Sequence, residues 1–263
     1  MKNGLHTIHI TDYDATFLKF GEGPRPAVFI PGLAYVTMPA QVERRREYAA
    51  NYAPEFTCYF IERRSNLTAG CTTRQMASDV YDFICALDLG KVYVEGTSQG
   101  GMIAQWLAID FPEVVEKLVL TVTLSRPNEE IKTTSKWLEV LKTQGGAAAL
   151  EVMAKDAYST RYLEEHGGAP IEAPPAEFAR PLDQYEILQK ACLTHNSYDE
   201  LNKIQCPTFV IGGWKDRIVS GMASVDIAEK LNCDLHMCDE LGHALDEEDP
   251  LYHKRVKDWF LKA

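Results

Sequence analysis

The sequence predicts an α/β protein built around a mostly parallel sheet. Short, continuously apolar runs recur along the chain with helical periodicity between them, at residues 27–30, 58–61, 92–95, 118–122, 208–211 and 235–238. Such runs are typical of strands that helices cover on both faces, which is the environment of a parallel sheet. The alternation of strand and helix therefore favours βαβ units.

The N-terminal segment shows a different pattern. Apolar and polar residues alternate through Ile8 and Ile10, the chain turns around residues 12–14, and an apolar stretch follows at residues 17–20. Alternation on both sides of a short turn predicts an antiparallel hairpin.

Residues 72–90 predict a helix with marked ends. Thr72 and Gln75 have the spacing of a capping box, and Gly90 is expected to stop the helix. Between these ends, apolar residues recur at helical spacing: Met76, Val80, Phe83, Ile84 and Leu87.

Residues 125–202 interrupt the strand pattern. They show helical periodicity, as in Trp137, Leu138 and Leu141, and residues 167–181 are rich in proline and glycine and predict a loop. We therefore expect a core formed by residues 1–124 and 203–263, with a helical insert at residues 125–202. The insert has too few apolar residues to fold alone.

The charge balance narrows the class of partner. The chain of 263 residues has 27 basic and 38 acidic residues, which gives a formal net charge of -11. This acidity disfavours nucleic acid and anionic membranes, so a small-molecule substrate is the expected partner. The longest basic run, Arg44 to Arg46, is interpreted as a solvated helix face. The sequence does not indicate the oligomeric state.

Cysteine usage indicates a reducing compartment. Seven cysteines are scattered along the chain, and the first residues lack the apolar run of a signal peptide. We therefore expect a cytoplasmic protein. Cys233, His236 and Cys238 are close in sequence, but Cys233 and His236 would point to opposite faces of a strand, so no metal site is expected.

Gly96 to Gly100 form the pattern G-x-S-x-G, with Ser98 at its centre. An apolar strand precedes this pattern and an apolar helical stripe follows it. Such a strand-turn-helix setting presents the serine hydroxyl on a sharp turn, where glycines allow the backbones to approach closely. Ser98 is the candidate nucleophile, and a tight turn without chemistry is the alternative.

A serine hydroxyl needs a base to remove its proton, and the base needs a carboxylate to orient it. In the expected order of serine, acid and histidine, Asp216 follows the strand at residues 208–211 and His243 follows the last strand. Both positions lie at strand ends on the edge that carries Ser98. Four other acids crowd the histidine loop and compete with Asp216 for this role, with solvated charge as their alternative interpretation: Asp239, Glu240, Asp246 and Glu247.

The tetrahedral intermediate of acyl transfer requires backbone N–H donors. The amide of Gln99, next to the nucleophile, is one candidate. The amide of Leu33, in the loop Pro31-Gly32-Leu33, is the second, although these residues are equally typical of an ordinary loop.

These motifs resemble those of the α/β-hydrolase superfamily, in particular its compact bacterial members with a helical cap, over nearly the whole chain. The matching segments are the oxyanion loop at residues 31–33, the nucleophile elbow at 96–101, the acid loop at 212–219 and the histidine motif at 242–243. Pro31 stands where the family often has histidine, and Ser65 and Asn66 stand where it often has Arg-Gly-x-Ser. The resemblance implies an eight-stranded, mostly parallel sheet, a cap over the active site, and no metal or organic cofactor.

The resemblance also implies acyl transfer to water through an acyl-enzyme on Ser98, with small or medium carboxylic esters as the default substrates. The same scaffold also supports hydrolysis of peptides, other amides, lactones and thioesters. A ligand sensor without catalytic activity could keep the fold as well. A peptidase would need an acidic clamp, for which Glu164, Glu165 and Glu172 are candidates by location. The aromatic residues of the insert are interpreted as packing within it: Trp137, Tyr158, Tyr162, Phe178 and Tyr185.

Overall fold

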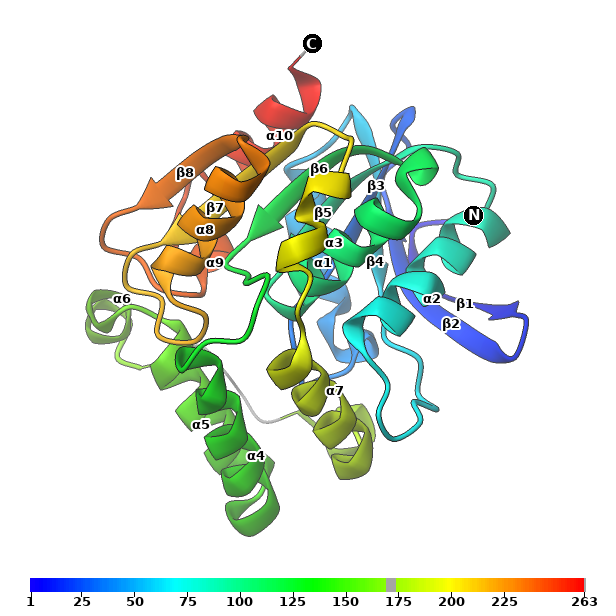
Figure 1. Cartoon of the computed structure of the whole chain (residues 1–263). Helices are drawn as coiled ribbons and strands as arrows, with labels where there is room; N and C mark the ends of the chain where they lie inside the picture. The colour runs from blue at the N-terminus through cyan, green and yellow to red at the C-terminus, as the bar shows by residue number, and fades with distance from the viewer. Residues whose placement is uncertain (169–173, 263) are drawn as a thin grey trace.

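A computed structural model describes residues 1–168 and 174–262 of the chain. It contains an eight-stranded sheet in the order β1-β2-β4-β3-β5-β6-β7-β8 (Figure 1). The strands from β3 to β8 are parallel to one another, whereas β2 pairs antiparallel with both β1 and β4. Their bounds are Gly4–Ile10, Tyr13–Phe20, Arg25–Ile30, Phe56–Ile61, Val92–Thr97, Val115–Thr121, Thr208–Gly213 and Asp234–Cys238 for β1 to β8. The predicted α/β class and mostly parallel sheet are confirmed.

The N-terminal hairpin is confirmed, but its turn lies slightly earlier than predicted. Thr11 and Asp12 form the turn, and Tyr13 pairs with Ile10 as the first residue of β2. Tyr13 belongs to the strand because its ring is buried and its hydroxyl donates to the carbonyl oxygen of Asp79 at 3.1 Å.

Helices cover both faces of the sheet, because side chains alternate between the faces along each strand. Val28, Val94 and Leu118 pack on one face with α2 (Thr73–Ala86), α3 (Gln99–Asp110) and α8 (Gly221–Leu231). Phe29 and Val119 pack on the other face with α1 (Val42–Ala50) and α10 (Tyr252–Leu261). The remaining short helices of the core are η1 (Met38–Gln41), η2 (Pro112–Val114) and α9 (Leu245–Glu248).

The predicted capping box is present at the start of α2. The Gln75 amide donates to Thr72 Oγ1 at 3.3 Å, and the Thr72 amide donates to Gln75 Oε1 at 2.9 Å. The helix ends at Ala86, four residues before Gly90, which adopts a left-handed conformation in the turn that follows. Gly90 therefore shapes the connection to β5 and does not itself end the helix.

Residues 125–202, here called the helical segment, lie between β6 and β7. Figure 1 shows α4, α5 and α7 projecting together from one end of the core. The predicted loop at 167–181 falls partly outside the described residues, and its described part contains the short helix η4. The elements are η3 (Glu130–Lys132), α4 (Thr133–Gln144), α5 (Gly146–Ala157), α6 (Thr160–Glu165), η4 (Ala176–Phe178), α7 (Leu182–Thr194) and η5 (Tyr198–Lys203).

The helices are short relative to a lipid bilayer. Within residues 1–168 and 174–262, none is both long and apolar enough to span a membrane.

Candidate active site

Ser98 lies at the sharp turn between β5 and α3. Its backbone has φ 55° and ψ −118°, a conformation that is costly for a residue with a side chain. Two contacts fix it there: the Ser98 amide donates to the Thr121 carbonyl at 2.9 Å, and Thr123 Oγ1 donates to the Ser98 carbonyl at 2.7 Å. The surrounding structure therefore holds the serine hydroxyl at the end of β5.

The two glycines of the motif are required by close backbone contacts. A Cβ atom on Gly100 would lie 1.8 Å from the carbonyl oxygen of Ile30, and one on Gly96 would lie 2.5 Å from the carbonyl oxygen of Gly100. Neither backbone oxygen can move without displacing β3 or α3. The pattern G-x-S-x-G is thus a packing requirement of this turn.

Asp216 and His243 meet although they are 27 residues apart in the sequence. Asp216 follows β7 and His243 follows β8, and His243 Nδ1 lies 2.8 Å from Asp216 Oδ2. A carboxylate only accepts hydrogen bonds, so Nδ1 of the ring carries the proton and donates it. The neutral ring then has Nε2 free to accept a proton. The Asp216 side chain is 1% exposed and that of His243 is 12% exposed.

Ser98 and His243 line one cavity of about 460 Å³. Asp216 lies behind the histidine and does not line this cavity. The other four acids of the histidine loop are placed differently. Asp239 and Glu240 are exposed, while Asp246 and Glu247 line the cavity and form ion pairs with Arg44.

The loop after β3 packs directly against the serine. A Cβ atom on Gly32 would lie 3.2 Å from Ser98 Cβ and 3.7 Å from Ser98 Oγ. The carbonyl oxygen of Pro31 accepts a hydrogen bond from Nη2 of the buried Arg63. Leu33 follows in the cavity lining, so the segment that carries its amide is beside the candidate nucleophile.

Gln99 is the first residue of α3, where backbone amides have no partner within the helix. Its side chain turns away into the interior: Nε2 donates to the Leu188 carbonyl at 2.7 Å and lies 3.0 Å from Cys192 Sγ. The side chain therefore ties the start of α3 to α7. The oxyanion roles of the Gln99 and Leu33 amides stay predictions.

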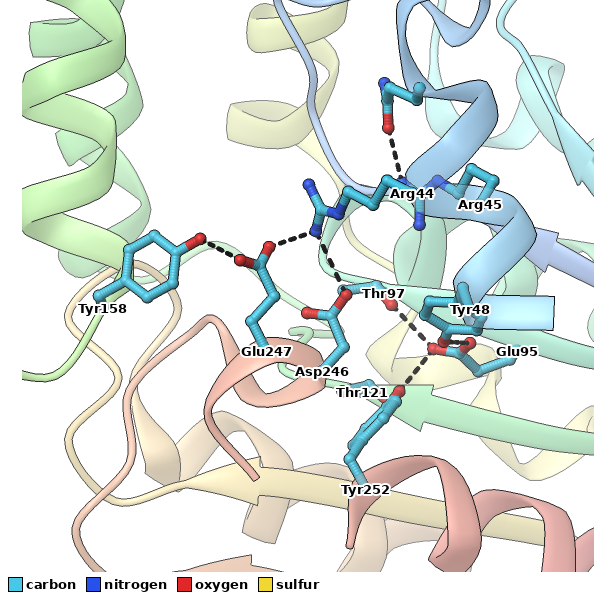
Figure 2. A network of polar contacts seen from close by, with 11 residues as sticks. Arg44, Arg45, Tyr48, Glu95, Thr97, Thr121, Tyr158, Asp246, Glu247 and Tyr252 are labelled. Carbon is cyan, nitrogen blue, oxygen red and sulfur yellow. Dashed lines mark hydrogen bonds and ion pairs between the residues drawn. The ribbon is translucent and has the colours of Figure 1, made fainter. Parts of the chain in front are cut away.

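The cavity has an apolar end and a polar end. Helices α4 and α5 supply much of the apolar end, with Trp137, Leu150 and Met153. The polar end holds Arg44 and Arg45 from α1, which Figure 2 shows opposite the acids of the histidine loop. Glu247 there accepts hydrogen bonds from both Arg44 and Tyr158.

The interpretation of Arg44 to Arg46 as a solvated helix face is wrong for Arg45, which lines the cavity with a partly buried side chain. Arg44 is exposed, with 51% of its side chain accessible, but it also lines the cavity and pairs with the acids of the histidine loop. Arg46 fits the prediction, with Glu43 as its partner at 3.2 Å on the same helix. The partners of Arg44 lie about 200 residues away in sequence, and helix periodicity carries no information about them.

Two of the three candidates for the acidic clamp of a peptidase, Glu164 and Glu165, do not line this cavity. Glu165 forms a surface ion pair with Arg161 at 2.7 Å, and Glu164 lines a separate surface hollow beside Lys215. Glu172 lies outside the described residues.

The aromatic residues of the helical segment divide between pocket and packing. Trp137 and Tyr158 line the cavity of Ser98. Tyr185 is fully buried among the helices, and the ring of Tyr162 stacks on that of Tyr158 with centroids 4.9 Å apart. Two of the five residues interpreted as packing thus also reach the site.

A buried ion pair that the sequence analysis missed fixes the loop after β3. Arg180 Nη2 lies 2.6 Å from Glu62 Oε1, and the two side chains are 4% and 13% exposed. Arg180 Nε also donates to the Ala34 carbonyl at 3.0 Å, and the Met38 amide donates to Glu62 Oε2 at 2.6 Å. The pair joins the end of β4 to the helical segment, so no local pattern could have revealed it.

The helical segment also contacts the loop that carries the histidine. The amides of His243 and Ala244 donate to the carbonyl oxygen of Ala157, at 2.8 and 3.1 Å. The Ser159 amide donates to Glu248 Oε1 at 2.9 Å, and the Ser159 hydroxyl donates to the same carboxylate. The connection between α5 and α6 thus holds the histidine loop through its backbone.

A buried carboxylate lies behind the polar end of the cavity. Glu95 accepts hydrogen bonds from the hydroxyls of Tyr48, Thr97 and Tyr252 at 2.5, 2.8 and 2.7 Å (Figure 2). Burial raises the pKa of Glu95. Within the described part of the chain, the hydrogen-bond donors to this carboxylate are these three hydroxyls, and none is a cation.

Comparison with known proteins shows similarity to α/β hydrolases. A family model described as the alpha/beta hydrolase fold matches residues 41–152. A relative from Pseudomonas syringae pv. syringae, named "Putative carbamate hydrolase RutD", is 27% identical over 201 residues, which are 75% of this chain and 78% of the relative.

Solved structures of similar fold cover almost the whole chain. MGS-M2, an alpha/beta hydrolase enzyme from a Medee basin deep-sea metagenome library, has a TM-score of 0.85 at 19% identity over 98% of both chains. A thermophilic esterase from Thermogutta terrifontis has a TM-score of 0.78 at 19% identity, also over 98% of both chains. The sheet order, the elbow at Ser98 and these likenesses show that the chain has the α/β-hydrolase fold.

Proposed function

We propose that this protein is a serine hydrolase that acts through an acyl-enzyme on Ser98. The observation that carries the proposal is the 2.8 Å contact of His243 Nδ1 with Asp216, in a cavity that His243 shares with the strained Ser98. A nucleophile, a base and an orienting acid are the groups that acyl transfer requires. Asp216 is the acid of this set, His243 the base, and the amides of Leu33 and Gln99 the oxyanion donors.

The reaction would proceed in two halves. Ser98 Oγ attacks the acyl carbon while its proton passes to His243 Nε2, and the oxyanion is stabilised by the two amides. The tetrahedral intermediate collapses, and the alcohol leaves with the proton from His243. Water then attacks the acyl-enzyme, gives its proton to His243, and the acid is released as Ser98 recovers its proton.

Small or medium carboxylic esters are the proposed substrates. A cavity of about 460 Å³ has the size of a small-molecule site, and its apolar end suits a short acyl or alkyl chain. Residues 125–202 act as a cap in this proposal, since α4 and α5 contribute to the cavity wall. Carbamates, lactones, thioesters and amides also contain an acyl carbon that Ser98 could attack, and they are the alternative substrates. The name of the Pseudomonas syringae relative includes carbamate hydrolysis.

Labelling with a fluorophosphonate probe tests the nucleophile. We expect wild type to label and Ser98→Ala not to label, while the exposed control Ser65→Ala labels like wild type. A series of 4-nitrophenyl esters of increasing acyl length then measures the length of the apolar end. Failure of wild type to label, or persistent labelling of Ser98→Ala, would contradict the proposal and favour a non-catalytic ligand sensor.

A further inference from the structure

Arg45 is a cation at the polar end of the cavity, and no carboxylate in residues 1–168 and 174–262 forms an ion pair with it. Its Nη2 donates to Gln41 Oε1 at 3.0 Å, and its guanidinium carbon lies 5.8 and 5.5 Å from the ring centroids of Tyr48 and Phe60. The Nε atom is buried and has no acceptor among the described residues. The neighbouring arginines differ, because Arg44 and Arg46 both form ion pairs.

The acids near Arg45 are already engaged by other groups. Glu247 accepts hydrogen bonds from Arg44 and Tyr158, and Asp246 lies 3.6 Å from Arg44. Glu95 accepts three hydroxyl hydrogen bonds. These acids of the polar end therefore form their hydrogen bonds and ion pairs with groups other than Arg45.

A partly buried guanidinium without a counter-charge is energetically unfavourable. Burial, together with the charge of Arg44, lowers the pKa of Arg45, although an arginine remains protonated at neutral pH. Arg45 lines the same cavity as Ser98. Its planar fork is suited to a carboxylate, which can accept two parallel hydrogen bonds from it.

We propose that Arg45 binds a carboxylate of the substrate, so that the preferred substrates are acyl compounds with a free acid at the end remote from the bond that is cleaved. The inference rests on the proposed function, because it concerns how the end of the substrate remote from Ser98 is bound. Half-esters of short dicarboxylic acids are the simplest members of this class. A phosphate fits less well, because it would bring a second negative charge beside Asp246 and Glu95.

Kinetics with matched esters test the inference. Each half-ester is paired with a neutral ester of similar shape in which a methyl group replaces the acid: monoethyl succinate with ethyl butanoate, monoethyl glutarate with ethyl pentanoate, and monoethyl adipate with ethyl hexanoate. For the acid of best-fitting length, we expect wild type to show a kcat/KM higher by roughly ten- to hundredfold than for its neutral partner. The length with the largest ratio reports the distance between Ser98 and Arg45.

Variants of neighbouring arginines provide the control. Arg45→Met should bring kcat/KM for each half-ester down to that for its neutral partner, and Arg45→Lys should retain part of the preference for acids. Arg46→Met, which alters the adjacent arginine outside the cavity, should keep the full preference. An equal loss for acidic and neutral esters in Arg45→Met would overturn the inference, as would a wild-type preference for neutral esters or for the cationic ethyl 6-aminohexanoate.

A binding measurement separates this inference from the proposed function. Glutarate and adipate are titrated calorimetrically into Ser98→Ala, into Ser98→Ala with Arg45→Met, and into Ser98→Ala with Arg46→Met. We expect binding in the first and third proteins and a loss of roughly tenfold or more in affinity in the second. If wild type hydrolyses no ester, the proposed function fails, and this titration still decides the role of Arg45: equal affinities in all three proteins, or no binding in any, would overturn it.

Discussion

The two oxygens of Asp216 have different partners: Oδ2 lies 2.8 Å from His243 Nδ1, whereas Oδ1 accepts the backbone amides of Ile218 and Val219 at 2.8 and 3.0 Å. The amides prevent the carboxylate from rotating. Because the carboxylate is fixed, the histidine ring is fixed as well, with Nδ1 protonated and Nε2 free.

Asp216→Asn is expected to lower kcat by about a thousand- to ten-thousandfold with little change in KM. The amide oxygen of asparagine would accept the two backbone amides, so its NH2 group would face Nδ1 and favour the tautomer with a protonated Nε2. Steady-state hydrolysis of 4-nitrophenyl butyrate measures the effect. Asp239→Asn, in the exposed part of the histidine loop, is the matched control and should retain wild-type activity. Near-normal turnover by Asp216→Asn would remove Asp216 from the mechanism.

Gly32→Ala is expected to impair catalysis more than stability. Its methyl group would lie 3.2 Å from Ser98 Cβ, so the loop or the serine must shift by a few tenths of an ångström. Displacements on this scale reduce rates strongly when reacting groups are misaligned, and we expect a loss of about tenfold or more in kcat. Steady-state kinetics and urea unfolding of the same preparation distinguish the two effects. A large loss of stability with unchanged kcat would contradict the position assigned to Gly32.

The fold could be predicted from the sequence because its signals are local. Apolar runs mark buried strands wherever they occur, and the capping box at Thr72 and the motif around Ser98 each span only a few residues. Asp216 and His243 could be selected because both follow strands whose ends share one edge of the sheet. Their contact is reported by the structure, and their roles in catalysis stay predictions.

The polar end of the cavity could not be predicted in the same way. Arg44 meets Glu247, and Glu62 meets Arg180, across more than 100 residues of sequence in each case. Such pairs depend on how α1 and the helical segment pack on the sheet, which the local pattern of charges does not specify. An arginine on a helix has the same sequence signature whether its guanidinium group faces water or a cavity.

Arg180→Met is expected to destabilise the protein by about 3 to 5 kcal/mol, because it leaves the buried Glu62 carboxylate without its cation. The free energy of unfolding in urea measures the loss. The exposed pair of Arg161 and Glu165 gives the control, and Arg161→Met should cost less than about 0.5 kcal/mol. Adding Glu62→Gln to Arg180→Met should recover part of the loss, and an Arg180→Met protein as stable as wild type would show that the pair does not stabilise the fold.

His195 is expected to make the free energy of unfolding depend on pH below about pH 6.5. The ring is buried, with Thr73 Oγ1 2.8 Å from Nδ1 and Ser197 Oγ 3.2 Å from Nε2, and burial lowers the pKa of His195 from 6.5 to about 3. Between these two values the unfolded chain binds a proton that the folded chain does not, so stability falls as the pH is lowered through 6.5 towards 3. At pH 5 this contribution amounts to about 2 kcal/mol.

Urea unfolding at pH 7.5 and pH 5 measures this dependence. His195→Gln should flatten it, because glutamine does not titrate, while the exposed control His9→Gln should leave it as in wild type. Identical pH profiles for His195→Gln and wild type would show that His195 takes up its proton equally in both states.

The hydrogen bonds from His243 and Ala244 to Ala157 link the position of His243 directly to the helical segment. A swinging motion that admits substrate must pivot at residues 157–159, since lifting that stretch would break the contacts that hold the histidine loop. Movement is left to the α4–α5 hairpin, beyond the pivot. A different helical segment grafted onto this core would need to preserve the carbonyl of Ala157 and the Ser159 contact with Glu248.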